Sequence, residues 1–588
     1  MAKWTITAKG ADFGAIASHF GIDPVVARVI RNRDLITNEE IDMFLNGTEN
    51  DEHDPKLLND LELAVGYIKE NIDHGKKIRV IGDYDVDGVT ATAILVKGIT
   101  AFGGRVDYRL PNRITDGYGI NERLVRDAIE DRVDCIITCD NGIAASEVLE
   151  LAESNGIMCI LTDHHEVPYT DVNGEREYII PRVHAVIDPK RPDNTYPYPN
   201  ICGAMVAYKL IQELLEGTAQ RDILQELTEL AALGTVCDVM ELRDENRVLV
   251  KRALSLMCNS SNIGLRTLFT VTGCENKPIK AGTLGFIAGP CINAAGRLED
   301  ASEPVELLLT EDEGKAVKIA TELKNLNDLR KEMTEKGVSR AIEIIEEDKI
   351  YNRTVMIIYI PGLHESLAGI VAGRIRERYY HPVIVLTDSD DMIKGSGRSI
   401  EAYDMFGELN KVKDLFTHFG GHKMAAGMSL DKNKLYELER RLNENPPIGM
   451  DECEERIRID VVMPLEYVSQ KLIDDISLLE PFGTGNPKPV FAERNLQFLH
   501  GRRMGALGNM ARFRVRTERN GEFDIVRFRN LDILLDYIRD KFGDKAVEDL
   551  FGAGYRETSP VRLNVIYTPE INEYRGQKNI SFIMNDYC

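Results

Sequence analysis

Acidic and histidine side chains gather in three short segments of the first half of the chain. The segments are Asp83-Tyr-Asp85-Val-Asp87-Gly88, Cys139-Asp140-Asn-Gly142 and Thr162-Asp163-His164-His165. Closely spaced carboxylates repel one another, so such a cluster is stable only when cations lie between them. Oxygen ligands mixed with imidazole suit Mn²⁺ or Mg²⁺, and the histidine favours manganese. Two such ions can activate a water and neutralise the leaving oxygen of a phosphodiester, so the segments predict a two-metal hydrolytic site.

The first segment also matches the opening of a calcium loop of the EF-hand type. That loop needs a bidentate glutamate at its twelfth position, which is Ile94 here. It also needs a preceding helix, whereas a strand is predicted before Asp83. We therefore exclude a calcium loop of this kind.

Each of the three segments follows a predicted β-strand. The strands are expected at 77–82, 133–139 and 157–162, and amphipathic helices alternate with them. This alternation indicates a parallel sheet covered by helices on both faces. Ligands of open parallel sheets bind beyond the carboxyl ends of the strands. Ordinary caps or turns would explain any one segment, but the three together predict a site at one sheet edge.

The whole chain is too long for a single hydrophobic core, at 588 residues. Its fold class is predicted to be α/β. The expected parts are a helical segment (1–55), a parallel-sheet domain (56–310), a connecting helix (311–350), a second α/β domain (351–450) and a small β-barrel (451–588). A glycine turn at Gly21 leaves a helix-turn-helix DNA reader open for the first segment, although such hairpins are usually packing units.

Charge is distributed unevenly along this acidic chain, whose formal net charge is −24. Residues 491–530 contain nine arginines against four acids, a local charge of +5. Arg512, Arg514 and Arg516 alternate, so on a strand they would project from one face while Phe513 and Val515 point into the barrel. Arginine pairs with phosphate and stacks on bases, so these side chains predict nucleic-acid binding. A merely solvated strand face is the alternative.

The cysteine spacing and the hydropathy of the sequence indicate in which cellular compartment the protein is expected. The ten cysteines form no Cys-x-x-Cys pair, which favours free thiols in a reducing cytoplasm. No apolar run is long enough to span a bilayer, and the first residues lack the apolar core of a signal peptide. We expect a cytoplasmic protein that does not contact a membrane.

The three acidic segments resemble motifs of the DHH phosphoesterase superfamily, which is named for Asp163-His164-His165. Further segments resemble the RecJ family of single-strand-specific exonucleases within it. They are Ile201-Cys-Gly-Ala204, Ala232-Leu-Gly-Thr-Val-Cys-Asp238, Ile292-Asn-Ala-Ala-Gly-Arg-Leu298, Phe419-Gly-Gly-His422 and Glu480-Pro-Phe-Gly-Thr-Gly-Asn-Pro487. The resemblance covers roughly residues 15 to 500.

The resemblance implies a catalytic role for each matched residue. The implied metal ligands are Asp85, Asp87, Asp140, His164 and Asp238, with Asp140 as the bridge between two ions. His165 would face the scissile phosphate or support a ligand. Asp83 and Asp163 would orient the histidines and waters. Gly88 would permit close backbone approach.

Substrate contacts are implied in the second half of the chain. The second α/β domain would be the DHHA1 domain, which closes over the substrate. Arg297, Ser396 and Arg398 would hold a 5′-terminal phosphate, for which a bidentate arginine is well suited. Gly421 and His422 would contact phosphate. Residues after 450 would form an oligonucleotide-binding (OB) barrel that carries Arg512, Arg514 and Arg516.

The activity implied is 5′-to-3′ hydrolysis of single-stranded DNA to mononucleotides in repair and recombination. The polarity comes from the resemblance alone. The implied protein is a monomer with two Mn²⁺ or Mg²⁺ ions, and a single-strand-binding protein or a helicase are the partners to consider. One alternative is a DHH phosphodiesterase for short oligoribonucleotides or cyclic dinucleotides, which typically lacks the barrel. Another is an inactive replication scaffold, which loses the ligands that this chain retains.

Three places depart from the RecJ pattern. Cys291 stands where an arginine is common, and a weaker contact to the nucleic-acid backbone is expected from it. Cys237 and Glu241 flank Asp238 where alanine and proline are common, and residues 364–369 replace a more glycine-rich turn. None of these changes removes an expected metal ligand.

Overall fold

The structure is a computed structural model. It describes residues 2–113, 115–172, 174–298, 301–389, 392–505, 508–552, 558–574 and 577–588. The chain forms two compact units, each of which is described by itself. One unit comprises residues 48–454, and the other combines residues 1–47 with residues 455–588.

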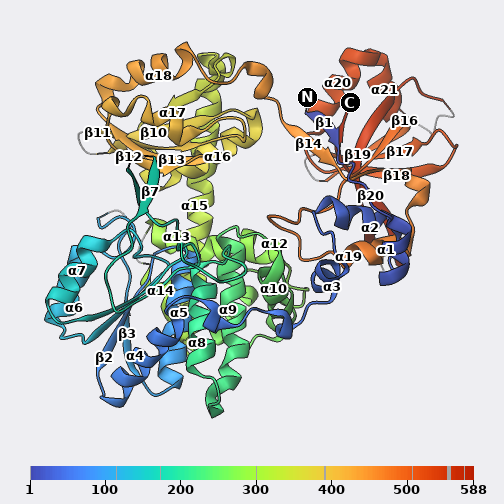
Figure 1. Ribbon diagram of the computed structural model, residues 1–588. Helices are drawn as coiled ribbons and strands as arrows, with labels where there is room; N and C mark the ends of the chain where they lie inside the picture. The colour runs from blue at the N-terminus through green and yellow to red at the C-terminus, as the bar shows by residue number, and fades with distance from the viewer. Residues whose placement is uncertain are drawn as a thin grey trace. The chain divides into compact units, whose positions relative to one another are not determined.

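The larger unit begins with the predicted parallel sheet (Figure 1). Its strand order is β3 (Arg105–Arg109), β2 (Lys77–Ile81), β4 (Cys135–Cys139), β5 (Met158–Thr162) and β8 (Ala185–Ile187), all parallel. One face packs on α4 (Leu61–Asp73), α5 (Val86–Ala101) and α8 (Gly203–Leu214). The other face packs on α6 (Glu122–Glu130) and α7 (Ser146–Ser154). The prediction of a sheet covered on both faces is confirmed.

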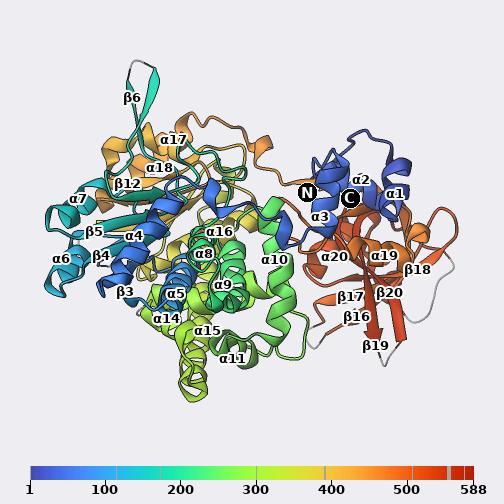
Figure 2. The same ribbon diagram turned by 60° about the horizontal axis from the view of Figure 1, so that its bottom comes forward.

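Between β5 and β8 the chain forms a hairpin that was not predicted from the sequence. Its strands are β6 (Tyr169–Val172) and β7 (Glu175–Tyr178), which pair only with each other. Figure 2 shows the hairpin projecting from the body of the domain.

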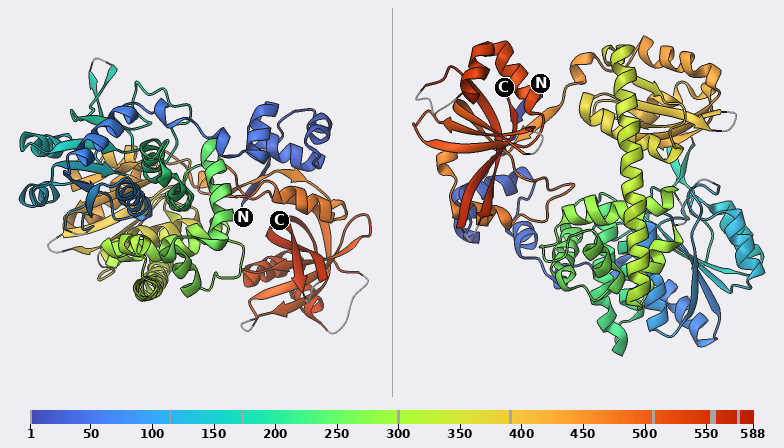
Figure 3. Two further views of the ribbon diagram at one scale, coloured as in Figure 1. Left: turned by 90° about the horizontal axis from the view of Figure 1, so that it is seen from below. Right: turned by 180° about the vertical axis from the view of Figure 1, so that it is seen from behind.

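Helices extend the core that α5 and α8 share. They are α9 (Leu224–Cys237), α10 (Asp244–Leu256), α11 (Ile263–Val271), the short α12 (Ala281–Thr283) with a π-helical turn (Leu284–Ala288), α13 (Gly289–Leu298) and α14 (Ser302–Leu309). The long helix α15 (Glu313–Glu347) follows. It packs on α13 and then on α16 (Ala368–Tyr379), and the right-hand view of Figure 3 shows it running from the first domain into the second. This is the connecting helix expected within 311–350.

The second domain of this unit is a mixed five-stranded sheet. Its order is β12 (Phe416–His422), β13 (Ala425–Leu430), β11 (Met392–Arg398), β10 (Val383–Ser389) and β9 (Met356–Tyr359). Only the β9–β10 pair is parallel among these strands. One face packs on α15 and α16, and the other on α17 (Met405–Asn410) and α18 (Leu435–Glu444). Gly395 lets β10 approach, because a Cβ there would lie 2.3 Å from the Val385 carbonyl oxygen.

The smaller unit contains the predicted barrel. Strands β16 (Phe491–Met504), β17 (Met510–Arg516), β18 (Glu522–Arg527), β20 (Gln577–Tyr587) and β19 (Arg562–Tyr574) pair in that order, and β19 pairs again with β16. This second pairing closes a five-stranded barrel. The short β15 (Val461–Val462) joins its rim, and α19 (Gln470–Ser477), α20 (Leu531–Phe542) and α21 (Asp544–Phe551) complete the unit.

The N-terminal segment packs on this barrel. β1 (Lys3–Ile6) pairs in parallel with β14 (Arg456–Ile459), and Arg33 forms a buried ion pair with Asp460 at 2.7 Å. Helices α1 (Phe13–Phe20), α2 (Pro24–Asn32) and α3 (Asn38–Asn46) share the barrel's hydrophobic core. Helix α2 buries Val26 and Ile30 there, which favours the packing alternative over a DNA reader. The structure thus groups residues 1–47 with the barrel, a long-range pairing that local sequence patterns do not reveal.

Among the described residues, no single helix has the length and apolarity needed to cross a bilayer. The pair α1 and α2 meets that test only when the two are joined across a bend of 108°.

Candidate metal centre and phosphate pocket

The three acidic segments lie at the carboxyl ends of β2, β4 and β5, which are neighbours in the sheet. Asp85 is the N-cap of α5, and its Oδ1 accepts hydrogen bonds from the amides of Asp87 (3.0 Å) and Gly88 (3.1 Å). A Cβ on Gly88 would lie 2.5 Å from the Asp83 nitrogen, so this tight loop requires glycine.

Asp87 is held by the first turn of α8. Its carboxylate accepts hydrogen bonds from the amides of Gly203 (2.7 Å) and Ala204 (2.8 Å). A Cβ on Gly203 would lie 2.6 Å from the Cβ of Asp140, and one on Gly234 would lie 2.7 Å from Oδ1 of Asp87. The two glycines of the Ile201–Ala204 and Ala232–Asp238 motifs therefore let α8 and α9 approach the carboxylates.

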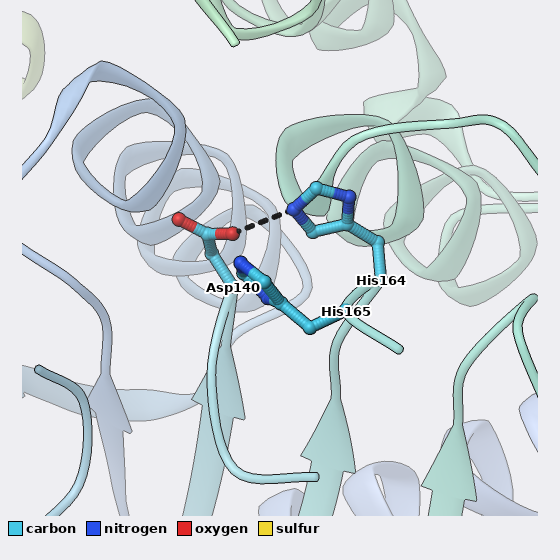
Figure 4. A group of neighbouring side chains, drawn as sticks. All are labelled: Asp140, His164 and His165. Atoms are coloured by element: carbon cyan, nitrogen blue, oxygen red, sulfur yellow. Dashed lines mark ion pairs between the residues drawn. The ribbon is translucent and has the colours of Figure 1, made fainter. Parts of the chain in front are cut away.

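The side chain of His164 lies among three of the acids. Its Nε2 lies 3.0 Å from Oδ1 of Asp140, 3.5 Å from Oδ2 of Asp87 and 3.8 Å from Oδ2 of Asp238. Asp238 is the C-cap of α9, and it enters the site from a helix end rather than a strand end. Figure 4 shows Asp140, His164 and His165 turned toward one another.

Three overlapping groups of these side chains have the spacing to hold a cation. They are Asp83 with Asp85 and Asp140, Asp87 with His164 and Asp238, and Asp140 with His164 and His165. The five expected ligands are thus all brought together. Asp83, for which the resemblance implied only an orienting role, belongs to one of the groups as well.

Electrostatics at this edge fit bound cations. Burial and neighbouring carboxylates raise the pKa of Asp140 well above its usual value, and that of Asp238 to about 8. Burial together with Asp85 likewise raises the pKa of Asp83 to about 8. Within the described part of the chain, Oδ2 of Asp83 and Nε2 of His164 are buried without a hydrogen-bond partner. Carboxylates packed this closely around an imidazole nitrogen match the donor set of Mn²⁺ or Mg²⁺.

His165 is fixed by Asp163. Oδ1 of Asp163 lies 2.7 Å from Nδ1 of His165 and accepts the backbone amide of His164 at 2.8 Å. Its Oδ2 accepts the amide of Ile143 at 2.9 Å. Burial alone would lower the pKa of His165, but the Asp163 carboxylate outweighs it and raises that pKa to about 9. This arrangement supports the expected orienting role of Asp163.

Tyr118 reaches the site from the loop after β3. Its hydroxyl donates to the Asp140 carbonyl oxygen at 2.5 Å and lies 3.2 Å from Nε2 of His165. No sequence signal marked this residue, because its position depends on how the loop folds back over the sheet edge.

Three of the expected phosphate-binding residues, Arg297, Ser396 and Arg398, line one pocket between the two domains of this unit. Its volume is 490 Å³. Arg297 lies at the end of α13, and its Nη1 donates to the Ser366 carbonyl oxygen at 2.8 Å. Ser396 and Arg398 lie on β11, where Nη1 of Arg398 donates to Oγ of Ser396 at 2.8 Å. A Cβ on Gly369 would lie 2.7 Å from Nη2 of Arg398, so the N-terminus of α16 closes over the guanidinium.

The pocket is positively charged. Arg113 and Lys394 also line it, and the one acid in the lining, Glu365, lies 3.2 Å from Lys394. Burial, and then Arg113 and two further arginines, lower the pKa of Arg297 to about 9. Arg113, which also lies over the ring of Tyr84 at 4.8 Å, was not predicted from the sequence.

Gly421 and His422 lie farther along the same sheet. In the strand register His422 is opposite Ala425, which is opposite Arg398. Side chains opposite one another share a face, so His422 is on the face of Arg398 and about 10 Å away across two strand spacings. Neither residue lines the pocket, and both are exposed.

The barrel arginines project from one face of β17 as expected, with Phe513 and Val515 buried behind them. However, Arg514 pairs with Glu522 (3.2 Å) and Asp524 (3.3 Å) of β18, and Arg516 pairs with Glu522 at 2.7 Å. Arg512 is exposed, and no ion pair to it is found among the described residues. Two of the three charges are therefore balanced within the barrel.

Cys291 does not face the pocket. It is 1% exposed and accepts a hydrogen bond from Nδ2 of Asn327 on α15 at 3.4 Å. This side chain is therefore buried between two helices, and the expectation that the departure from arginine weakens contacts to the nucleic-acid backbone stays a prediction.

Comparison with known proteins gives consistent results. Residues 77–235 match the DHH family, N-terminal domain, residues 352–445 the DHHA1 domain and residues 459–586 the RecJ OB domain. The single-stranded-DNA-specific exonuclease RecJ of Bacillus subtilis is 34% identical over 90% of this chain and 66% of its own length. The protein of that name in Escherichia coli is 31% identical over 96% of both chains.

Solved structures agree with this assignment. RecJ of Thermus thermophilus in complex with Mn²⁺ superposes with a TM-score of 0.79 at 26% identity, over 100% of this chain and 79% of that one. Its complex with Mg²⁺ gives a TM-score of 0.72 at 25% identity, over 100% and 78% of the two chains. The chain therefore belongs to the RecJ family of single-stranded-DNA-specific exonucleases.

Proposed function

We propose that the protein is an exonuclease that hydrolyses single-stranded DNA from its 5′ end and releases mononucleotides, with two Mn²⁺ or Mg²⁺ ions. The observation that carries the proposal is the acid and histidine cluster at the edge of the parallel sheet, with an arginine-lined pocket on the same unit. Family membership supports the substrate, and the 5′ polarity rests on that resemblance alone.

Five residues would hold the cations: Asp85, Asp87, Asp140, His164 and Asp238. When bound, the ions supply Lewis acidity and neutralise charge at the phosphate. Asp163 holds His165 beside the cluster, where this imidazole can donate a proton or hydrogen bond toward a phosphate oxygen. We place Asp83 among the acids that contact a cation or its waters, because its free oxygen faces the same group.

The pocket selects strand ends. A terminal phosphate monoester carries about 1.5 to 2 negative charges near neutral pH, whereas a diester carries one. Arg297 and Arg398, which line the pocket together with Ser396, therefore attract a terminal phosphate more strongly than an internal one. Gly421 and His422 would contact a phosphate farther along the strand, since they lie outside the pocket on the same sheet face.

The proposal also covers the compartment, the oligomeric state and the partners of the protein. We place the protein in the cytoplasm as a monomer that acts in DNA repair and recombination, and its ten free cysteines support a reducing compartment. The barrel would bind the substrate strand, and a single-strand-binding protein or a helicase would be its protein partners.

The test is hydrolysis of a single strand labelled at one end. With Mn²⁺ or Mg²⁺, a 5′ label should appear at once as mononucleotide, whereas a 3′ label should pass through progressively shorter fragments. EDTA should abolish both signals, and a blunt duplex of the same sequence should resist. Release of the 3′ label first would contradict the polarity, and a strong preference for dinucleotides would contradict the exonuclease itself.

A further inference from the structure

The hairpin β6–β7 leaves the domain directly beside the metal centre. Tyr169 begins β6 only four residues after His165, so it lies within about 14 Å of that residue along even a fully extended chain. Figure 2 and the left-hand view of Figure 3 both show the hairpin projecting from the domain. Its described side chains are exposed on both strands.

One face of the hairpin carries an aromatic pair with an arginine. Tyr169 and Tyr178 are opposite each other, with ring centroids 5.9 Å apart at an interplanar angle of 57°. Cζ of Arg176 lies 4.5 Å from the centre of the Tyr169 ring. The acid of this face, Asp171, accepts the amide of Gly174 at 3.0 Å and so belongs to the turn. The opposite face carries Glu175 and Glu177 instead.

The rings of Tyr169 and Tyr178 are exposed and are not part of a hydrophobic core. Tyr169 is 48% exposed and Tyr178 40%, and neither belongs to a hydrophobic core cluster. A two-stranded hairpin without a core is marginally stable, so its ring pair helps to hold the strands together. About half of the Tyr169 side chain and two fifths of the Tyr178 side chain nevertheless stay accessible. Flat aromatic and guanidinium surfaces of this kind are what unpaired bases stack on.

The strand order places the hairpin on one side of the metal centre and the phosphate pocket on the other. Arg113, which lines the pocket, follows β3, whereas the hairpin follows β5. The acids after β2 and β4 lie between them. If a terminal phosphate occupies the pocket and the next phosphate lies at the acids, the rest of the strand continues toward β5.

We propose that the Tyr169, Tyr178 and Arg176 face is a stacking platform for unpaired bases of the substrate strand beyond the scissile phosphate. The inference rests on the proposed function and deepens it. Bases of a duplex are stacked on one another and cannot offer their faces, so the platform favours single strands. The opposite face, with Glu175 and Glu177, would repel a polyanion, so the strand is expected on the aromatic face.

The test compares two double variants on long and short substrates. Tyr169→Ala/Tyr178→Ala removes the rings, and the matched control Tyr169→Phe/Tyr178→Phe keeps them. Each base that stacks contributes a loss of about tenfold when its ring is removed. For a long oligothymidylate, KM should rise about tenfold in the alanine variant if one base stacks and about 100-fold if two do, while kcat and the kinetics on a dinucleotide stay unchanged. The phenylalanine variant should match the wild type.

A second readout needs no hydrolysis. In EDTA, the fluorescence of 2-aminopurine placed at successive positions of a single strand should be quenched at one or two positions by the wild type and not by the alanine variant. Because removing both rings can loosen the hairpin, Arg176→Gln tests the same platform with the ring pair intact, and it should weaken the quenching partially.

The outcomes separate the two proposals. Unchanged KM and quenching in the alanine variant, or an equal loss on dinucleotides, would overturn the platform alone. A wild type that hydrolyses neither substrate would overturn the proposed function, and the quenching assay would still decide whether the hairpin stacks on bases.

Discussion

Charge is arranged in opposite ways at the edge of the parallel sheet and on strand β17 of the barrel. At the sheet edge, Asp87, Asp140 and Asp238 surround the imidazole of His164. These three acids outnumber the nearby His165, whose raised pKa makes it cationic. On β17, Arg514 and Arg516 lie beside carboxylates of the neighbouring strand. The first region needs ions from solution, whereas the second has its own counterions.

This difference identifies where ligands belong. The phosphate pocket also carries unbalanced charge, but its charge is positive. Arg297 and Arg398 line it, and the only acid in its described lining, Glu365, is paired with Lys394. Burying unbalanced charge of one sign costs folding free energy, so such charge is typical of sites that bind a ligand of the opposite charge. By this criterion Arg512 is the arginine of β17 that is most available to nucleic acid.

The strongest test of the sheet edge is Asp140→Asn, which keeps the shape and removes one charge. Exonuclease activity with Mn²⁺ should fall more than about 100-fold, the upper end for residues that only support metal ligands. Asp134→Asn, at the other end of β4, is the matched control and should retain activity. Activity of the Asp140 variant above a tenth of wild type would remove this residue from the site.

The pocket is tested next by Arg398→Ala. Loss of a charged hydrogen bond costs about 1.5 to 3 kcal/mol, so kcat/KM on a 5′-phosphorylated strand should fall about 10- to 100-fold. A 5′-hydroxyl strand should lose little. Arg398→Lys should recover only part, since lysine cannot form the bidentate contact, and Arg378→Ala on nearby α16 should have no effect. Equal losses on the two strands would contradict a terminal-phosphate pocket.

Removal of metal should make stability depend on pH. The pKa values of Asp83 and Asp238 in the folded protein are about 8, above the unfolded value of about 3.9. The folded state therefore binds more protons between these values, and the stability of the EDTA-treated protein should fall as pH rises from 6 to 8 and level off above that. We expect a decrease in Tm of about 2 °C or more.

Added Mg²⁺ should reverse this trend, because cations bind the deprotonated acids and stabilise the folded state most at high pH. Asp238→Asn should reduce the pH dependence of the metal-free protein. A Tm that rises with pH in EDTA would show that the acids do not repel one another as their burial implies.

The smallest effects are expected in the barrel. Arg512→Ala should weaken binding of a long single strand a few-fold and reduce the salt slope by about one unit, as for the loss of one phosphate contact. Arg514→Ala should change the slope less, since Asp524 and Glu522 already neutralise that guanidinium. The reverse order would mean that the ion pairs open when DNA binds.

Much of the catalytic edge could be predicted from the sequence, because strand–loop signals are local. The strands before Asp85, Asp140 and His164 are short apolar runs, and parallel sheets bring their ends to one edge. Asp238 gave no such signal, since it follows a buried helix, and only the resemblance identified it. Tyr118 and Arg113 are positioned by loops, which no pattern fixed.

Long-range pairing explains the remaining differences. The parallel β1–β14 pair and the Arg33–Asp460 ion pair join residues more than four hundred positions apart, so the N-terminal helices gave no indication of their partner. The ion pairs of Arg514 and Arg516 depend on the register of β17 with β18. A count of charges along the chain cannot resolve that register.

The number of residues in helix α15 sets the distance and the angle between the domain with the acids and the domain with Ser396 and Arg398. Its 35 residues extend about 52 Å without interruption, with Arg297 near one part and β11 beyond the other. One residue inserted between the α13 and α16 contacts would advance the second domain by about 1.5 Å and rotate it by about 100°. Such an insertion would turn Ser396 and Arg398 away from Arg297 while leaving every side chain in place. If a terminal phosphate binds in the phosphate pocket as proposed, the length of α15 determines which phosphate of the strand reaches the acids, whereas its sequence matters far less for that distance.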